Sequence, residues 1–115
     1  MQAVDDFSLV IEPGQFLAVQ GPSGCGKTTL LLISGGLLAP DKGEVSIDGE
    51  NPYSLTPDQR ARFRAAKIGF VFQQFHLVPY LTVRDNVLAA SIAAPSPDAA
   101  ARTDELLERL NMTHR

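Results

Sequence analysis

The sequence has little of what disulfide scaffolds, membrane spans and nucleic-acid-binding proteins need. It has no tryptophan and a single cysteine, Cys25, so an intrachain disulfide is excluded and a reducing compartment is favoured. No apolar run approaches the roughly 20 residues of a membrane-spanning helix, and the acidic start, residues 1–6, has no signal-peptide pattern. The net charge of −3 gives no basic patch for nucleic acid. With 44% hydrophobic residues in 115, the composition predicts one globular, cytoplasmic domain.

Short apolar segments alternate with helix signals, which predicts an α/β fold. Residues 16–20 and 68–72 are almost continuously apolar, as expected of strands covered on both faces of a parallel sheet. Residues 44–48 alternate as a third strand. Capping signals and apolar spacing predict helices over residues 27–38, 56–67 and 82–94, with a last helix that Ser96 caps.

The most specific feature of the sequence is a glycine-rich segment between the first strand and the first helix. Residues 21–28, GPSGCGKT, match the phosphate-loop (Walker A) pattern G-x-x-x-x-G-K-[ST] without a mismatch. Nucleotide phosphates are held by successive backbone N–H groups in a tight loop, and Gly21, Gly24 and Gly26 allow that path without a Cβ collision. The helix that follows directs free N–H groups and the positive end of its dipole at the same place. The segment therefore predicts a nucleotide-binding site.

The side chains at the end of this loop have chemically distinct roles in the prediction. Lys27 supplies a full positive charge to the β- and γ-phosphates, and the Thr28 hydroxyl ligates Mg²⁺. Thr29 adds a contact on the α-phosphate side. Cys25 is most simply a small residue at a variable position of the loop. The predicted nucleotide-binding residues are Gly21, Pro22, Ser23, Gly24, Cys25, Gly26, Lys27, Thr28 and Thr29.

The second half of the chain narrows the choice among the protein families that have a phosphate loop. Residues 67–87, KIGFVFQQFHLVPYLTVRDNV, resemble the Q-loop region of ATP-binding cassette (ABC) transporter ATPases. Residues 11–24 and 43–49 are similar to the same family, and the resemblance covers roughly residues 3–112. Within this family, the amino-acid sequence is most similar to the lipoprotein-release and macrolide-efflux branch. The resemblance implies a P-loop NTPase fold, with part of a RecA-like parallel sheet core, an antiparallel β portion and the beginning of an α-helical subdomain.

The resemblance also implies a role for Gln73, which follows the apolar segment 68–72. It would be the Q-loop glutamine, in contact with Mg²⁺ and the attacking water. Lys27 and Gln73 would then be the catalytic residues, and Thr28 and Gln73 the metal ligands. An amide oxygen can bind a hard cation without adding charge. Residues 1–73 would form the nucleotide-binding core, and residues 74–115 the Q-loop region and the start of the helical subdomain.

Partners follow from the same resemblance. The cofactors would be ATP and Mg²⁺, and a second ATP-binding subunit would complete a dimer. Transmembrane permease subunits would hold the protein on the inner face of the cell membrane. The segment that would meet them contains Phe75, Leu77, Val78, Pro79 and Tyr80, for which local packing is the alternative.

Three elements of the family do not occur in these 115 residues: a signature stretch of Leu-Ser-Gly-Gly-Gln type, a Walker B strand ending in Asp-Glu, and a switch histidine. Residues 34–36, Ser-Gly-Gly, fall too early to be the signature. We therefore expect an N-terminal fragment of a transporter ATPase that is inactive alone, because hydrolysis needs the missing groups. The alternatives are a non-hydrolysing nucleotide-binding or regulatory module and a P-loop kinase. A kinase would have no use for the Gln73 segment.

Overall fold

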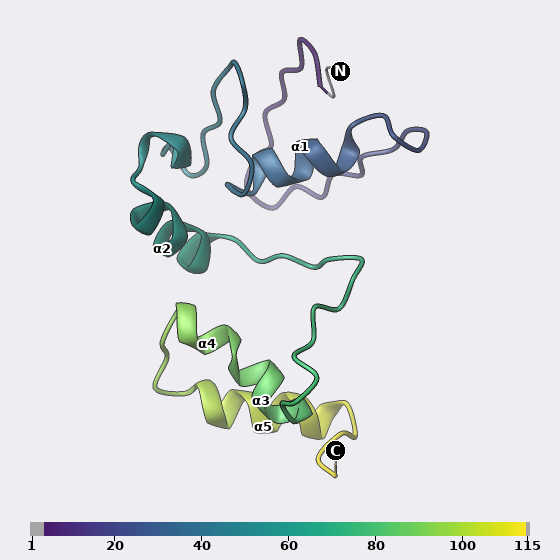
Figure 1. Ribbon diagram of the computed structural model, residues 1–115, viewed down its shortest axis with the longest axis vertical. Coiled ribbons are helices and arrows are strands. Elements are labelled where there is room, and N and C mark those ends of the chain that lie inside the picture. The colour runs from purple at the N-terminus through teal and green to yellow at the C-terminus, as the bar shows by residue number, and fades with distance from the viewer. Residues whose placement is uncertain (1–3, 115) are drawn as a thin grey trace. The chain divides into compact units, whose positions relative to one another are not determined.

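The computed structural model describes residues 4–114, which divide into two compact units between Thr56 and Pro57 (Figure 1). The first unit contains helix α1, Lys27–Ser34, and a short 3₁₀ helix η1, Pro52–Ser54. The second contains four helices: α2, Pro57–Lys67; α3, Val83–Leu88; α4, Ala90–Ala93; and α5, Ala99–Arg109. The division predicted at residue 73, between a nucleotide-binding core and the start of a helical subdomain, stays a prediction.

Helix α1 is shorter than predicted, because two glycines end it. The sequence pattern extended it to Leu38, but the chain turns at Gly35 and Gly36, and Gly36 has a φ of 72°. The N–H of Leu37 then donates to the carbonyl of Leu32 at 2.9 Å, and that of Gly36 to Ile33 at 3.2 Å. This pair of bonds is the Schellman arrangement that closes many helices. Because apolar residues lie on both sides of these glycines, the sequence pattern did not indicate that the helix ends there.

The 3₁₀ helix η1 is tied to the carboxyl end of α1. The Tyr53 hydroxyl donates to the carbonyl of Ile33 and lies 2.6 Å from the carbonyl oxygen of Leu38. Asn51 caps η1, since its side-chain oxygen accepts from the Tyr53 N–H at 2.9 Å. Pro52 is fully buried. The Ile33 carbonyl thus accepts both from the Gly36 N–H and from the Tyr53 hydroxyl, which ties η1 to the end of α1.

The three predicted strands are not formed as strands in residues 4–114. Residues 16–20 and 68–72 have no regular structure, and Phe16 and Val71 are 95% and 100% exposed. A strand exists only through backbone bonds to a neighbour, and neither segment has one within its own unit. In the described residues, the third strand is reduced to an antiparallel bridge between Ile47 and Glu50. Its two bonds, 2.8 and 3.1 Å, close the turn through Asp48 and Gly49, both with positive φ, as in a tight hairpin.

The second unit has four helices where the sequence pattern predicts three, and not every boundary agrees. Helix α2 ends at Lys67 as predicted, and Thr82 caps α3 by accepting from the Asp85 N–H at 3.1 Å. The helix predicted over 82–94 is divided into α3 and α4 at Ala89. Helix α5 begins at Ala99, three residues after the predicted cap: Ser96 instead forms a turn in which its carbonyl accepts from the Ala99 N–H at 3.1 Å.

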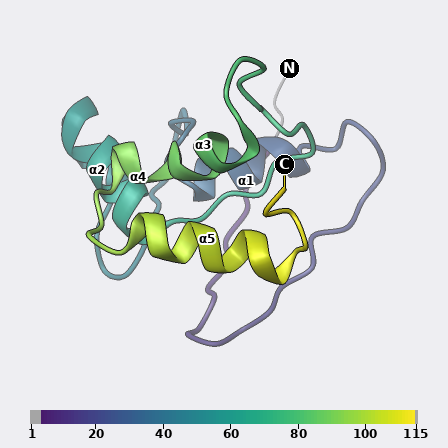
Figure 2. The same ribbon diagram turned by 90° about the horizontal axis from the view of Figure 1, so that it is seen from below.

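Helices α3 and α5 lie side by side, and the small core of this unit is on α5 and α2 (Figure 2). Thr103 and Leu107 on α5 are buried, as is Phe63 on α2. Of the three leucines at the end of α5 and at its C-cap, Leu107 is buried, whereas Leu106 and Leu110 are 39% and 66% exposed. None of the helices in residues 4–114 combines the length and the hydropathy that a membrane-spanning helix needs.

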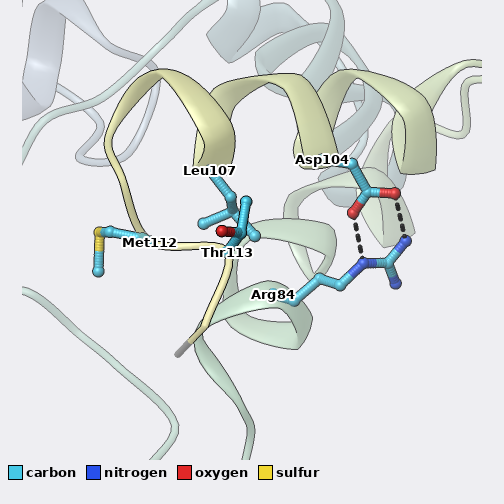
Figure 3. Close-up of a pocket in the computed structure, with 5 residues that line it drawn as sticks. All are labelled: Arg84, Asp104, Leu107, Met112 and Thr113. Atoms are coloured by element: carbon cyan, nitrogen blue, oxygen red, sulfur yellow. Dashed lines mark hydrogen bonds and ion pairs between the residues drawn. The ribbon is translucent and has the colours of Figure 1, made fainter.

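A bidentate ion pair joins α3 to α5 across this contact (Figure 3). Arg84 Nε lies 2.6 Å from Asp104 Oδ1, and Nη2 lies 3.1 Å from Oδ2. Both side chains are about half exposed and line a cavity of about 190 Å³ together with Leu107, Met112 and Thr113. The hydrogen bond from Arg84, reinforced by the attraction between the two charges, lowers the pKa of the Asp104 carboxyl.

We expect the Asp104→Asn variant to melt at a lower temperature than the wild type near neutral pH. The folded-state pKa of Asp104 lies below its ordinary value of 3.8, so the stabilisation is present above that pH and is lost as the pH falls through the lowered pKa. The difference in Tm should therefore close in strong acid, and also in about 1 M salt, which screens exposed charges. Circular dichroism melts measure it, with Glu105→Gln on the same helix as the control. A difference that persists in acid would contradict the ion-pair origin.

Candidate nucleotide-binding site

The glycine loop has the backbone that its sequence predicts. Gly24 and Gly26 have φ values of 79° and 93°, a region that residues with a Cβ rarely adopt. The third glycine, Gly21, lies close to Cys25: a Cβ built on Gly21 would lie 2.7 Å from Cys25 Sγ. The N–H of Cys25 donates to the carbonyl of Pro22 at 3.3 Å and closes the loop on itself. Glycine is thus favoured at Gly24 and Gly26 by the backbone conformation and at Gly21 by the close approach of Cys25.

The loop ends at the amino terminus of α1. The N-cap residue is Gly26, which has no side chain to cap the first turn, and that turn carries no acidic residue. The first N–H groups of a helix have no intrahelical acceptor, and the helix dipole places partial positive charge there. This end of α1 is therefore suited to an anion.

Lys27 folds back over the loop. Its ammonium donates to the carbonyls of Gly21 and Pro22, both at 2.7 Å, and lies 3.5 Å from Cys25 Sγ. A lysine ammonium has three donors, and these contacts accommodate all three. The positive charge is thus held at the loop by short bonds to backbone atoms. A phosphate bound by the loop would find this charge at the loop and would replace loop atoms as acceptors of the Lys27 N–H groups.

The two threonines that follow differ in exposure. Thr28 is exposed and Thr29 is half-buried. A hydroxyl is a hard oxygen donor of the kind that Mg²⁺ accepts, so exposed Thr28 fits the predicted metal ligand. Within residues 4–114 there is no group of three or more His, Cys, Asp or Glu side chains that could hold a metal ion.

Gln73 lies in the other unit, in a bend directly after residues 68–72, and is exposed. The structure thus places the predicted residues 21–29 in the loop and the first turn of α1, while Gln73 belongs to the other unit. Next to Gln73, Phe72 stacks on Phe70 with ring centres 5.3 Å apart and meets His76 edge-on at 5.2 Å. The catalytic and metal-binding role of Gln73 stays a prediction.

The segment after Gln73 is exposed and apolar, and it is held by a residue that the sequence analysis did not single out. Phe75, Leu77 and Tyr80 are 87%, 67% and 86% exposed. The Asn86 side chain on α3 makes hydrogen bonds to the backbone of Val78, Leu81 and Thr82. The available signal was an asparagine inside a predicted helix, where its side chain commonly competes for backbone bonds.

Comparison with known proteins identifies the family to which this loop and fold belong. The glycine loop running into α1 defines a phosphate-loop nucleotide-binding domain. A family model described as ABC transporter matches residues 4–115, so the chain belongs to the ABC transporter ATP-binding family. In the solved dimeric post-hydrolysis structure of the ATP-binding cassette MJ0796 bound to ADP and Pi, a chain 40% identical superposes with a TM-score of 0.83 over 95% of this chain and 49% of that one. This confirms the predicted P-loop NTPase fold class, although its sheet strands are not formed here.

Curated relatives come from both branches that the sequence resembles. The lipoprotein-releasing system ATP-binding protein LolD 1 of Rhodopirellula baltica is 46% identical over 110 residues, covering 94% of this chain and 48% of the relative. The macrolide export ATP-binding/permease protein MacB of Rhodopseudomonas palustris is 42% identical over 115 residues, covering 98% of this chain and 18% of the relative. The chain spans about half the length of the first of these.

Proposed function

We propose that this chain is the phosphate-binding part of a transporter ATPase and binds Mg-ATP through residues 21–29. The observation that carries the proposal is the Lys27 ammonium, held 2.7 Å from two loop carbonyls at the open amino terminus of α1. A fixed positive charge, left-handed glycines and a helix terminus together make a site for a polyphosphate.

The residues of the loop divide the work on the nucleotide. Backbone N–H groups of residues 21–29 hold the phosphate oxygens, and Lys27 neutralises charge on the β- and γ-phosphates. Bound Mg²⁺ would supply charge neutralisation between those phosphates, and the Thr28 hydroxyl and the Gln73 amide oxygen are the donors that fit it. Gln73 would also orient the attacking water in the complete protein.

The complete protein would couple ATP binding and hydrolysis to transport across a membrane. A relative whose name joins ATP-binding and permease functions, and a related cassette solved as a dimer, support two kinds of partner: permease subunits and a second ATP-binding subunit. Exposed Phe75, Leu77 and Tyr80 are the surface that we assign to the permease. Attachment through that surface would place the protein on the inner face of the membrane.

The isolated chain is expected to bind nucleotide without releasing phosphate. Hydrolysis needs a positioned base and donors to the transferring phosphoryl group, and the signature, Walker B and switch motifs that supply them do not occur in these 115 residues. A phosphate-release assay on residues 1–115 with Mg-ATP should therefore stay at background. A rate above background that disappears in Lys27→Ala would contradict this prediction.

A separate observation tests the whole-protein proposal against the non-hydrolysing alternative. Reading the coding sequence past Arg115 should show a Leu-Ser-Gly-Gly-Gln stretch and an apolar strand ending in Asp-Glu. A stop codon at that point would favour the binding or regulatory module.

A further inference from the structure

One side chain holds both backbone polar groups of Val78. The N–H of Val78 donates to Asn86 Oδ1 at 2.8 Å, and Asn86 Nδ2 donates back to the Val78 carbonyl at 3.1 Å. A carboxamide accepts through its oxygen and donates through its nitrogen, as the backbone of a neighbouring strand would. Val78 is therefore fixed in position and in the orientation of its peptide planes.

The same amide nitrogen reaches the end of the turn. Asn86 Nδ2 lies 3.0 Å from the Thr82 carbonyl and 3.2 Å from that of Leu81, so its two protons are shared among three acceptors. The Leu81 N–H donates to the Val78 carbonyl at 3.1 Å and closes the turn from within. Residues 78–82 are thus gathered around one half-buried side chain.

This attachment lies within the apolar segment that has no other cover. Every residue from 71 to 82 is exposed except Val78, which is half-buried. Phe75, Leu77 and Tyr80 lie on either side of the residue that Asn86 holds. A turn that is ordered before it binds does not lose that conformational freedom on binding, so its partner is bound more tightly.

We propose that Asn86 is a positioning residue: its carboxamide fixes the backbone of residues 78–82 and so sets how Phe75, Leu77 and Tyr80 meet a transmembrane partner. The partner in this statement rests on the proposed function, whereas the hold of Asn86 on the turn does not. Asn86 touches no nucleotide site and acts only through this turn.

The chemistry of the amide gives a sharp set of variants. Asn86→Asp keeps an acceptor for the Val78 N–H, but a carboxylate would repel the carbonyls of Val78, Leu81 and Thr82. Asn86→Ala removes every one of these bonds. Asn111→Asp makes the same chemical change at an exposed position beyond α5 and is the matched control.

Limited digestion of the full chain with chymotrypsin tests the hold on the turn. Tyr80 is exposed, and cleavage after it requires the turn to open. We expect Asn86→Ala and Asn86→Asp to be cleaved after Tyr80 about tenfold faster than the wild type or more, and Asn111→Asp at the wild-type rate. Buried Phe63 in the same unit should stay protected, and cleavage after exposed Phe16 should be unchanged.

Two results of the digestion would overturn the assignment of Asn86. One is cleavage after Tyr80 at the same rate in all four proteins. The other is faster cleavage after Tyr80 and Phe63 together, because that would mean general unfolding of the unit.

A binding measurement then tests the consequence for the partner. The probe is the permease part of the Rhodopseudomonas palustris MacB protein in lipid nanodiscs, titrated against each variant. We expect the half-saturating concentration to rise about tenfold in Asn86→Asp and to stay unchanged in Asn111→Asp. Equal binding by the wild type and Asn86→Asp would overturn the proposal. If the wild type does not bind while the digestion rates differ, the permease assignment fails and the hold of Asn86 on the turn stands.

Discussion

Replacing Lys27 with alanine is expected to lower the affinity for Mg-ATP about 10- to 150-fold. The change removes a charge-assisted contact to the terminal phosphates, and such contacts contribute about 1.5 to 3 kcal/mol. Stability should change little, with Tm shifting by less than about 4 °C, because the carbonyls of Gly21 and Pro22 that lose the lysine are exposed to water. Isothermal titration calorimetry measures the affinity, and a thermal melt measures the stability.

Lys42→Ala is the control for the loss of one positive charge. Lys42 is exposed in a bend of the same unit, outside the phosphate loop. Its replacement should leave the affinity within about twofold of the wild type, because an exposed charge at a distance is screened. If Lys27→Ala binds Mg-ATP as well as Lys42→Ala does, the site at residues 21–29 is wrong.

The phosphate loop was predictable from the sequence because its chemistry is local. The glycines at residues 24 and 26, the lysine and the helix start all lie within one short segment, and each has a physical reason that needs no distant partner. The caps at Thr82 and the end of α2 were predictable for the same reason. What the spacing did not show is where the Lys27 ammonium rests, which depends on carbonyls directed by the fold of the loop.

The features that escaped prediction join residues that are far apart or depend on a neighbour. The Arg84 and Asp104 pair spans 20 positions, and the Tyr53 hydroxyl bonds a carbonyl 20 residues earlier. The strand predicted over residues 16–20 from their apolar pattern does not form. A strand requires a second backbone to pair with, and Phe16 instead stays almost fully exposed. The local apolar pattern thus indicates only a preference for a strand, and the strand forms only where a second backbone pairs with it.

Replacing Gly24 with valine is expected to lower the affinity for Mg-ATP about 5- to 150-fold. At a φ of 79° a β-branched residue is strained, at a cost of about 1 to 3 kcal/mol. A Cβ at Gly24 meets no atom within 4 Å, so the strain comes from the backbone alone and not from a collision. The loop would relax to another path, and its N–H groups would no longer converge on the phosphates. Calorimetric titration with Mg-ATP measures the loss.

Gly14 offers a control with the same φ and with equal free space for a Cβ. Its φ is also 79°, a Cβ there also meets nothing within 4 Å, and it lies in the turn closed by the bond from the Gln15 N–H to the Glu12 carbonyl. Gly14→Val should therefore lower Tm about as much as Gly24→Val does and leave the affinity for Mg-ATP unchanged. Equal loss of affinity in both variants would mean that valine acts by destabilising the unit. A normal affinity in Gly24→Val would show that nucleotide binding does not need the left-handed backbone at this position. Only a loss confined to Gly24→Val ties the strained residue to the phosphate, because strain and space are the same at both glycines and their place in the chain differs.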